Sequence, residues 1–132
     1  MLSHDQLIDR FYDSYNRHDA AAAAALYADD GSHVEVAMSK TRSGASALQA
    51  GLEGFFRMMP DVVWQERERI RSADSIAVVY TMTGHVATRA TETAVEPKPF
   101  ALPGLHLFKF QDGRIIETQD LWSKADFLAQ IA

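Results

Sequence analysis

The sequence contains no cysteine, which excludes disulfide bonds, thiolate catalysis and cysteine-based zinc sites. It also lacks a run of about 20 apolar residues and a basic segment followed by an apolar one, so we expect neither a membrane span nor a targeting segment. Positive charge is in the minority, because 13 Lys and Arg stand against 18 Asp and Glu. These absences predict a cytoplasmic protein that binds neither nucleic acid nor membrane.

The residues that are present describe a folded chain. Hydrophobic residues make up 47% and charged residues 23% of the 132 positions, as is typical of globular proteins. A chain of this length removes roughly two-thirds of its surface from water on folding, which is enough for a core of its own. Neither an internal repeat nor a linker is visible. We therefore expect a single domain over residues 1–132.

Helical patterns fill much of the first half. Ser3 and Gln6 have the spacing of a capping box, and Asp19 is a suitable N-cap for a second helix over 20–28. The apolar face of the first helix is predicted to hold Leu7, Ile8, Phe11, Tyr12 and Tyr15. A turn at 29–31, a short strand at 33–37 and a third helix from about 44 to Met58 should follow.

Strand patterns fill the second half. We expect strands over 62–71, 75–90 and 114–122, and one that ends at 105–110 and has three prolines near its start. Ser123 should cap a short final helix. In the strand over 62–71, alternation predicts one apolar and one charged face, with Val62, Trp64 and Ile70 on the first and Arg67, Arg69 and Arg71 on a solvated or interface face.

This order of elements predicts an α+β fold. Three N-terminal helices would pack on a curved, mostly antiparallel mixed sheet to form a cone-shaped roll, and a short C-terminal helix would follow. The layers of such a roll enclose a conical space, which is either filled by side chains or used as a hydrophobic pocket.

The same order, together with certain short motifs, resembles the SnoaL-like branch of the nuclear transport factor 2-like superfamily. The matching pieces are 11–15, Leu26-Tyr27-Ala28-Asp29-Asp30, Ser43-Gly44, Met59-Pro60-Asp61, Thr83-Gly84-His85, 112–117, Asp120 and Leu128-Ala129-Gln130. SnoaL-like proteins resemble polyketide cyclases and are similar to ketosteroid isomerases. The resemblance implies the cone-shaped fold, a homodimer formed through the sheet and chemistry without a cofactor. Because this fold hosts many activities, it does not define one reaction.

Asp120 is the first catalytic candidate. Period-two alternation places it on one strand face with Ile116, Thr118 and Trp122, where an unpaired buried carboxylate would cost several kcal/mol. The resemblance implies that it is the acid or base of a SnoaL-like cyclase. Alternatively, Asp120 caps the final helix or pairs with an arginine.

Glu35 and His106 complete the predicted catalytic set. Glu35 shares a strand face with His33, and the resemblance places it where ketosteroid isomerases carry their general base. An apolar cavity would raise its pKa. The resemblance places His106 where those enzymes donate a proton to an oxyanion. The alternatives are a solvent-exposed or ion-paired Glu35 and a buried His106 bound to a backbone carbonyl.

Aromatic and imidazole side chains are candidates for contact with a small ligand. The predicted substrate-binding residues are Tyr12, Tyr15, His33, Phe56, Trp64, Tyr80, His85 and Trp122. Each of them is equally compatible with a place in the core or at a strand end.

Several family patterns are missing. Phe11 stands where ketosteroid isomerases have a tyrosine, and the Arg-x-Asp pair of limonene epoxide hydrolases is absent from 78–83. The five histidines lack HxH and HExxH spacing, so we expect no metal site. The sequence thus supports two readings. One is a cofactor-independent enzyme, such as a cyclase, isomerase or lyase, which passes a small hydrophobic carbonyl compound through an enolate. The other is a non-catalytic binding or dimerisation module.

Overall fold

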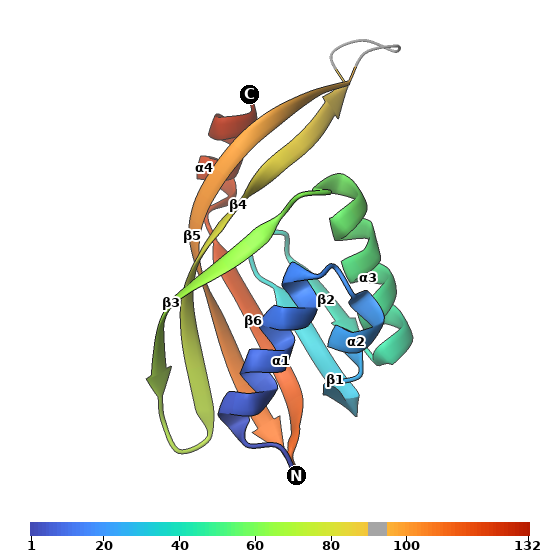
Figure 1. Ribbon diagram of the computed structural model, residues 1–132, viewed down its shortest axis with the longest axis vertical. Helices are drawn as coiled ribbons and strands as arrows, with labels where there is room; N and C mark the ends of the chain where they lie inside the picture. The colour runs from blue at the N-terminus through green and yellow to red at the C-terminus, as the bar shows by residue number, and fades with distance from the viewer. Residues whose placement is uncertain (90–94) are drawn as a thin grey trace.

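The computed structural model describes residues 1–89 and 95–132 (Figure 1). Its helices are α1 (His4–Asn16), α2 (Ala20–Ala24), α3 (Ala45–Met58) and α4 (Lys124–Ile131). Its strands are β1 (Tyr27–Glu35), β2 (Lys40–Ser43), β3 (Val63–Arg71), β4 (Ser75–Arg89), β5 (Val95–Gln111) and β6 (Arg114–Trp122). The expected end of the strand at Ala90 lies outside the described residues.

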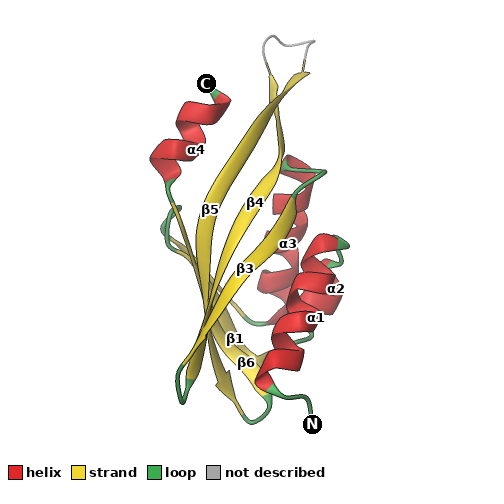
Figure 2. Cartoon of the chain, turned by 60° about the vertical axis from the view of Figure 1, so that its left-hand side comes forward, coloured by secondary structure: helices red, strands yellow, loops and turns green. Residues whose placement is uncertain are grey.

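The described strands form one six-stranded sheet in the order β2-β1-β6-β5-β4-β3. All neighbouring strands are antiparallel except β1 and β6, which are parallel. Figure 2 shows α1, α2 and α3 on one side of this twisted sheet and α4 on the other. The α+β fold with a mixed sheet is therefore confirmed.

The first helix forms as the sequence predicts. The Ser3–Gln6 capping box is present in both directions. The five apolar side chains predicted for its inner face are all buried against the sheet: Leu7, Ile8, Phe11, Tyr12 and Tyr15. Asp19 caps α2 by accepting a hydrogen bond from the Ala22 N–H, and Ser123 caps α4 in the same way from the Asp126 N–H.

The segment after α2 differs from the prediction. The helix ends at Ala24, not near 28, and the expected turn at 29–31 lies inside β1. The pairing of β1 with β6 shifts register between Tyr27 and Ser32. This irregularity contains the Asp and Gly residues that led to the predicted turn. A Cβ at Gly31 would lie 2.9 Å from the Ala28 carbonyl oxygen, so this close approach requires glycine.

Strand β2 was missed altogether. All four of its residues are exposed, so the strand has no apolar alternation that could reveal it. It pairs with β1 from Ser32–Ser43 to Glu35–Lys40 and forms one edge of the sheet.

Each of two strands departs from the predicted alternation at a bulge, although Trp64 of β3 and Asp120 of β6 lie on the expected face. In β3 an extra residue, Arg67, stands between the pairs that Glu66 and Glu68 make with β4. Side chains beyond this bulge change faces, so Ile70 is exposed whereas the side chain of Arg69 is only 14% exposed.

In β6 the extra residue is Ile116, because Ile115 pairs with Phe110 and Glu117 with Lys109. Ile115 therefore takes the fully buried position that alternation assigns to Ile116.

The prolines lie within β5, not at its start. Ala101 lies on the same side of the β5 backbone as Pro97, Pro99 and Pro103. Its N–H points away from β4 and donates to Gln130 Oε1 of α4. At these alternate positions of β5 the backbone N–H does not hydrogen-bond to β4. Proline, which has no backbone N–H, is therefore tolerated there.

The outer face of the sheet carries apolar side chains. Val79, Leu105 and Leu121 pair across β4, β5 and β6, on the face opposite the buried His106 and Asp120, and Leu121 is exposed. A homodimer through this face stays a prediction. In the described ranges, no helix combines the length and the apolar character needed to cross a bilayer.

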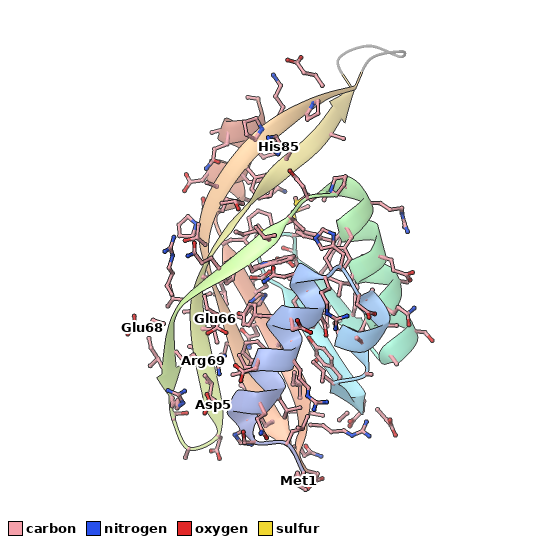
Figure 3. All side chains as sticks on the ribbon, viewed as in Figure 1. Met1, Asp5, Glu66, Glu68, Arg69 and His85 are labelled. Atoms are coloured by element: carbon pink, nitrogen blue, oxygen red, sulfur yellow. The ribbon has the colours of Figure 1, made fainter. Side chains whose placement is uncertain are left out.

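A cluster of ion pairs joins α1 to β3 at the point where Figure 3 labels Asp5, Glu66 and Arg69. The guanidinium of Arg69 contacts Asp5 at 2.9 Å, Asp9 at 2.5 Å and Glu66 at 2.7 Å. Arg71, which is more exposed, contacts Asp5 at 2.6 Å. Hydrogen bonds from Arg71 and Arg69 hold the pKa of Asp5 below its ordinary value of 3.8. Arg69 therefore belongs to a contact between α1 and β3, whereas Arg67 and Arg71 are exposed.

Replacing Arg69 with methionine should lower the free energy of unfolding by about 2 kcal/mol, because three carboxylates lose their shared, largely buried cation. Arg71→Met is the matched control, and its more exposed ion pair should contribute less than about 1 kcal/mol. Urea unfolding at neutral pH measures both changes. Equal losses in the two variants would show that the burial of Arg69 is without consequence.

Candidate active site

A cavity of about 430 Å³ lies between the sheet and helices α2 and α3. The apolar part of its wall includes Ala23, Leu48, Leu52 and Phe55, and its polar groups come mainly from the sheet. This is a size and composition suited to a small, mostly apolar molecule. The pocket expected from the cone-shaped fold therefore exists.

Strand pairing brings the predicted catalytic residues into one row. Glu35 of β1 pairs with Asp120 of β6, which in turn pairs with His106 of β5. Paired residues on neighbouring strands project to the same side, so all three side chains leave the sheet on the helix-covered face. Asp120 and Glu35 line the cavity, whereas His106 is fully buried and is not among the residues that line it.

Asp120 is a buried carboxylate with partners on two sides. Its Oδ1 accepts a hydrogen bond of 2.6 Å from the Tyr80 hydroxyl, and its Oδ2 lies 3.4 Å from His106 Nε2. Burial opposes ionisation, but the charges of His106 and His33 and the Tyr80 hydrogen bond outweigh it and hold the pKa of Asp120 below its ordinary value of 3.8. Neither alternative from the sequence applies, since Ser123 caps the last helix and the partners of Asp120 are not arginines.

Gly104 makes the contact between Tyr80 and Asp120 possible. It pairs with Tyr80 across β4 and β5, and the phenol ring lies so close to its backbone that a Cβ there would overlap the ring and the hydroxyl. The ring can therefore reach across β5 to Asp120 on β6. Gly104 is not among the residues predicted from the sequence, although a lone glycine inside a strand is a signal of close approach.

His106 lies behind Asp120 as seen from the cavity. Its Nδ1 is 2.7 Å from the Tyr12 hydroxyl, and its Nε2 has no hydrogen-bond partner within the described residues. The 3.4 Å approach to Asp120 is thus an ion-pair contact when the imidazole is protonated. The expected role as a direct donor to an oxyanion does not fit this position, because His106 does not reach the cavity. It can act only through Asp120.

Glu35 is held by two donors. Its Oε1 accepts a hydrogen bond of 2.6 Å from the indole N–H of Trp122, and its Oε2 lies 3.3 Å from His33 Nε2. Burial raises the pKa of Glu35 above its ordinary value of 4.5 and the charge of Asp120 adds to this, although His33 and Trp122 oppose it. The predicted direction of the Glu35 pKa therefore agrees with its surroundings.

His33 continues the hydrogen-bonded chain into the sheet. Its Nδ1 is 2.7 Å from Thr118 Oγ1, which is 2.5 Å from the Tyr27 hydroxyl. Burial is the main reason that the pKa of the Tyr27 hydroxyl lies above its ordinary value of 10.0. The hydroxyl therefore stays protonated and fixes Thr118 and His33.

Three of the predicted substrate-binding residues line the cavity, namely Tyr15, His33 and Trp64. The other five are placed elsewhere: Tyr12, Phe56, Tyr80, His85 and Trp122. Tyr12, Tyr80 and Trp122 instead hold His106, Asp120 and Glu35, as described above. Phe56 stacks on His18, while the neighbouring Phe55 faces the cavity.

His85 lies outside the cavity wall, on β4 beside the segment that follows α3 (Figure 3). It pairs with Asp61 at 2.6 Å on the surface, and about half of each side chain is exposed. Its predicted contact with substrate therefore does not fit its place in the fold.

His33, Glu35 and Asp120 also form a possible set of metal ligands. One ligand atom from each lies within 4.8 Å of the others, a grouping that the spacing of histidines in the sequence does not reveal. Nitrogen and carboxylate oxygen are donors that divalent cations accept. Both nitrogens of His33 and both oxygens of Glu35 are already engaged within the protein. A cation would have to displace the contact between them.

The arrangement combines two carboxylates whose pKa values move in opposite directions inside one cavity. Such a pair can divide the roles of base and acid between its members, since one is ionised where the other still holds a proton. The chemistry available is therefore proton removal and proton return on a small bound molecule.

Comparison with known proteins places the fold in a family. Residues 8–118 match the model of the SnoaL-like domain, and the chain belongs to this family. The expected place among SnoaL-like proteins is thus confirmed. No curated protein sequence gives a significant match.

Solved structures share the whole fold at low sequence identity. A protein of ketosteroid isomerase-like fold from Catenulispora acidiphila, in complex with trimethylamine, is 22% identical with a TM-score of 0.85, and the match covers 98% of this chain and 94% of that one. A proposed polyketide cyclase from Pseudomonas putida is 19% identical with a TM-score of 0.81, and both chains are covered completely. TerC, co-crystallised with polyporic acid, is 17% identical with a TM-score of 0.80, and 96% of each chain is covered.

The Tyr80→Phe variant tests what holds Asp120 ionised. Loss of the hydroxyl should raise the pKa of Asp120 and lower the free energy of unfolding at neutral pH by about 2 kcal/mol, the usual contribution of a hydrogen bond to a charged group. A carboxylate of depressed pKa stabilises the fold above its ordinary pKa, so the difference between variant and wild type should shrink as the pH falls.

Carboxyl-carbon NMR titration follows the pKa, and urea unfolding follows the stability. Tyr27→Phe is the control, because the Tyr27 hydroxyl contacts Thr118 and not Asp120. An unchanged Asp120 titration in Tyr80→Phe would contradict the role given to this hydrogen bond.

Proposed function

We propose that this protein is a cofactor-independent acid–base enzyme that acts on a small, mostly apolar carbonyl compound. The observation that carries the proposal is the pair Glu35 and Asp120, which face each other across β1 and β6 in one cavity and have pKa values displaced in opposite directions. The SnoaL-like family and the polyketide cyclase among its structural neighbours support the same class of reaction.

Asp120 is the base in this proposal. Its carboxylate takes a proton from the carbon next to the substrate carbonyl, and the electron pair of the broken C–H bond passes into an enolate. Because its pKa is depressed, Asp120 is already ionised at neutral pH. Tyr80 fixes one oxygen by a hydrogen bond, and the proton is accepted by a carboxylate lone pair on the side of Asp120 that lines the cavity.

Glu35 is the acid. Its raised pKa keeps a larger protonated fraction than an ordinary glutamate has, and that proton can be donated to the enolate oxygen. The same enolate leads to ring closure, to a double-bond shift or to loss of water. The proposal therefore covers the reactions of a cyclase, an isomerase and a dehydratase.

A non-catalytic binding module is the alternative function. The observation that favours it is the complete engagement of His33 and Glu35 by protein groups, which makes them parts of a structural network. A binding module would bind a carbonyl compound but leave its acidic hydrogens unexchanged.

Exchange of hydrogen for deuterium in 2-tetralone separates these functions, because this apolar ketone has acidic hydrogens beside its carbonyl. The wild-type protein should accelerate the exchange above the rate in buffer, as followed by proton NMR in deuterated water. Asp120→Asn should lower the accelerated rate by about 100-fold or more, as expected for a removed general base.

Asp74→Asn provides the matched control, since Asp74 is an exposed carboxylate in the turn between β3 and β4. It should leave the exchange rate within about twofold of wild type, as for an exposed residue outside the cavity. Binding of 2-tetralone without accelerated exchange would support the binding module and contradict the enzyme.

The pH dependence should identify the acid. If protonated Glu35 is required, kcat/KM for the exchange should fall as the pH rises through the raised pKa of Glu35, once the rate in buffer is subtracted. Glu35→Gln keeps an acceptor for Trp122 but carries no titrating proton, so its rate should be at least about tenfold lower and should lack this alkaline limb. The measurement is the same exchange assay over an acidic to mildly alkaline series. A limb that persists in Glu35→Gln would assign the titration to another group.

A further inference from the structure

The cavity carries positive charge that the proposed acid–base step does not use. Lys40, Arg42 and Arg57 all line it. These three residues are exposed, so they mark the side on which the cavity meets solvent, whereas Asp120 lies at its buried end. Acidic residues outnumber basic ones by 18 to 13 in the whole chain, yet among the described residues the only acids that line the cavity are Glu35 and Asp120. The wall of the cavity thus reverses the charge balance of the protein.

The register of β2 directs two of the cations to the cavity side. Lys40 pairs with Glu35 and Arg42 pairs with His33, and paired strand residues project to the same side of a sheet. Exposure of the whole strand therefore does not mean that all of its side chains face away from the site. The edge strand that sequence patterns missed supplies the cationic wall.

Helix α3 is shaped to accept Arg42. A Cβ at Gly51 would overlap the Cδ and Nε atoms of Arg42, so the guanidinium end of this side chain lies directly on the helix backbone. Glycine is a poor helix former, and Gly51 stands in the middle of a 14-residue helix. The close approach of Arg42 gives a reason for glycine at this position.

None of the three cations is neutralised by a neighbour. Within the described residues, Lys40, Arg42 and Arg57 form neither an ion pair nor a side-chain hydrogen bond. Arg69 is the contrast, since three carboxylates surround it in a structural contact. Unpaired guanidinium groups at the rim of an apolar cavity are suited to a carboxylate or a similar planar anion.

We propose that the cavity takes an anionic molecule, with an apolar body and one acidic group that pairs with Arg42 and is flanked by Lys40 and Arg57. Repulsion from Glu35 and Asp120 disfavours the reverse orientation, so the uncharged end of the molecule reaches the buried carboxylates. This inference rests on the proposed function only for the reaction at the uncharged end of the molecule. It defines the substrate class as an acid that also bears a carbonyl group.

A matched pair of fluorescent probes tests the inference without any assay of activity. The anion 1-anilinonaphthalene-8-sulfonate and the neutral N-phenyl-1-naphthylamine share the same aromatic body and differ by one sulfonate. Arg42→Met should weaken binding of the anion by about fivefold or more and binding of the neutral probe by less than about twofold. Added salt should likewise weaken only the anion.

Gly51→Ala gives a second and independent variant. The new methyl group displaces Arg42 without removing its charge, and alanine favours the helix, so the unfolding temperature should not fall. Binding of the anion should still weaken selectively. Lys124→Met is the control, since Lys124 is an exposed cation at the start of α4, outside the cavity wall, and it should leave both affinities unchanged.

Amide chemical shifts locate the bound probe, with Leu48 and Phe55 reporting the cavity and Val79 and Leu105 the outer face of the sheet. The inference is overturned if the anion does not bind, if its shifts map to the outer face, or if Arg42→Met weakens both probes equally. Any of these results with a normal 2-tetralone exchange rate would refute the anionic substrate and leave the acid–base function intact. Selective binding of the anion without accelerated exchange in 2-tetralone would support the anionic substrate and contradict the acid–base function.

Discussion

The structure depends on one buried carboxylate, that of Asp120. A charge removed from water destabilises a fold unless hydrogen bonds and opposite charges replace the lost hydration. Here the replacement comes from two other strands, through the Tyr80 hydroxyl of β4 and the imidazole of His106 on β5. Each of these depends in turn on a further residue, because Gly104 leaves room for the Tyr80 ring and Tyr12 of α1 holds the far nitrogen of His106. The position of a single ionised group thus links the first helix to the centre of the sheet.

The parallel pairing of β1 and β6 turns this structural group into a site. All other strand pairs in the described sheet are antiparallel, and this one brings Glu35 directly opposite Asp120 at the cavity. Two carboxylates so placed cannot share the same ionisation behaviour. Asp120 has imidazole and phenol partners that favour its charge, while the burial of Glu35 and the nearby charge of Asp120 oppose ionisation of Glu35. The difference between the two groups therefore follows from their neighbours and not from their residue type.

Much of this could be predicted from the sequence, and the errors have physical causes. Helix caps and apolar stripes are local signals, so α1, α3, β6 and α4 lie where the patterns indicate. Period-two alternation fails beyond a bulge, which is why Ile70 and Ile116 were placed on the wrong faces. A short, fully polar edge strand leaves no periodic trace, so β2 was missed. The sequence also led to Asp120, Glu35 and His106, but not to their different positions, because only the fold shows that His106 stands behind Asp120, outside the cavity wall.

The two ends of the cavity differ in charge because they belong to different parts of the sheet. The inner strands β1 and β6 supply the two carboxylates, and the edge strand β2 and helix α3 supply cations that are exposed to solvent. A bound molecule that excludes water would lower the effective dielectric in the cavity. It would thereby strengthen the electrostatic interactions of the carboxylates and of the cations. It would also raise the pKa of Glu35 further, because desolvation is already the largest influence on this group. Binding and protonation of Glu35 are therefore coupled, so Glu35 stays protonated to a higher pH in an occupied cavity than in an empty one.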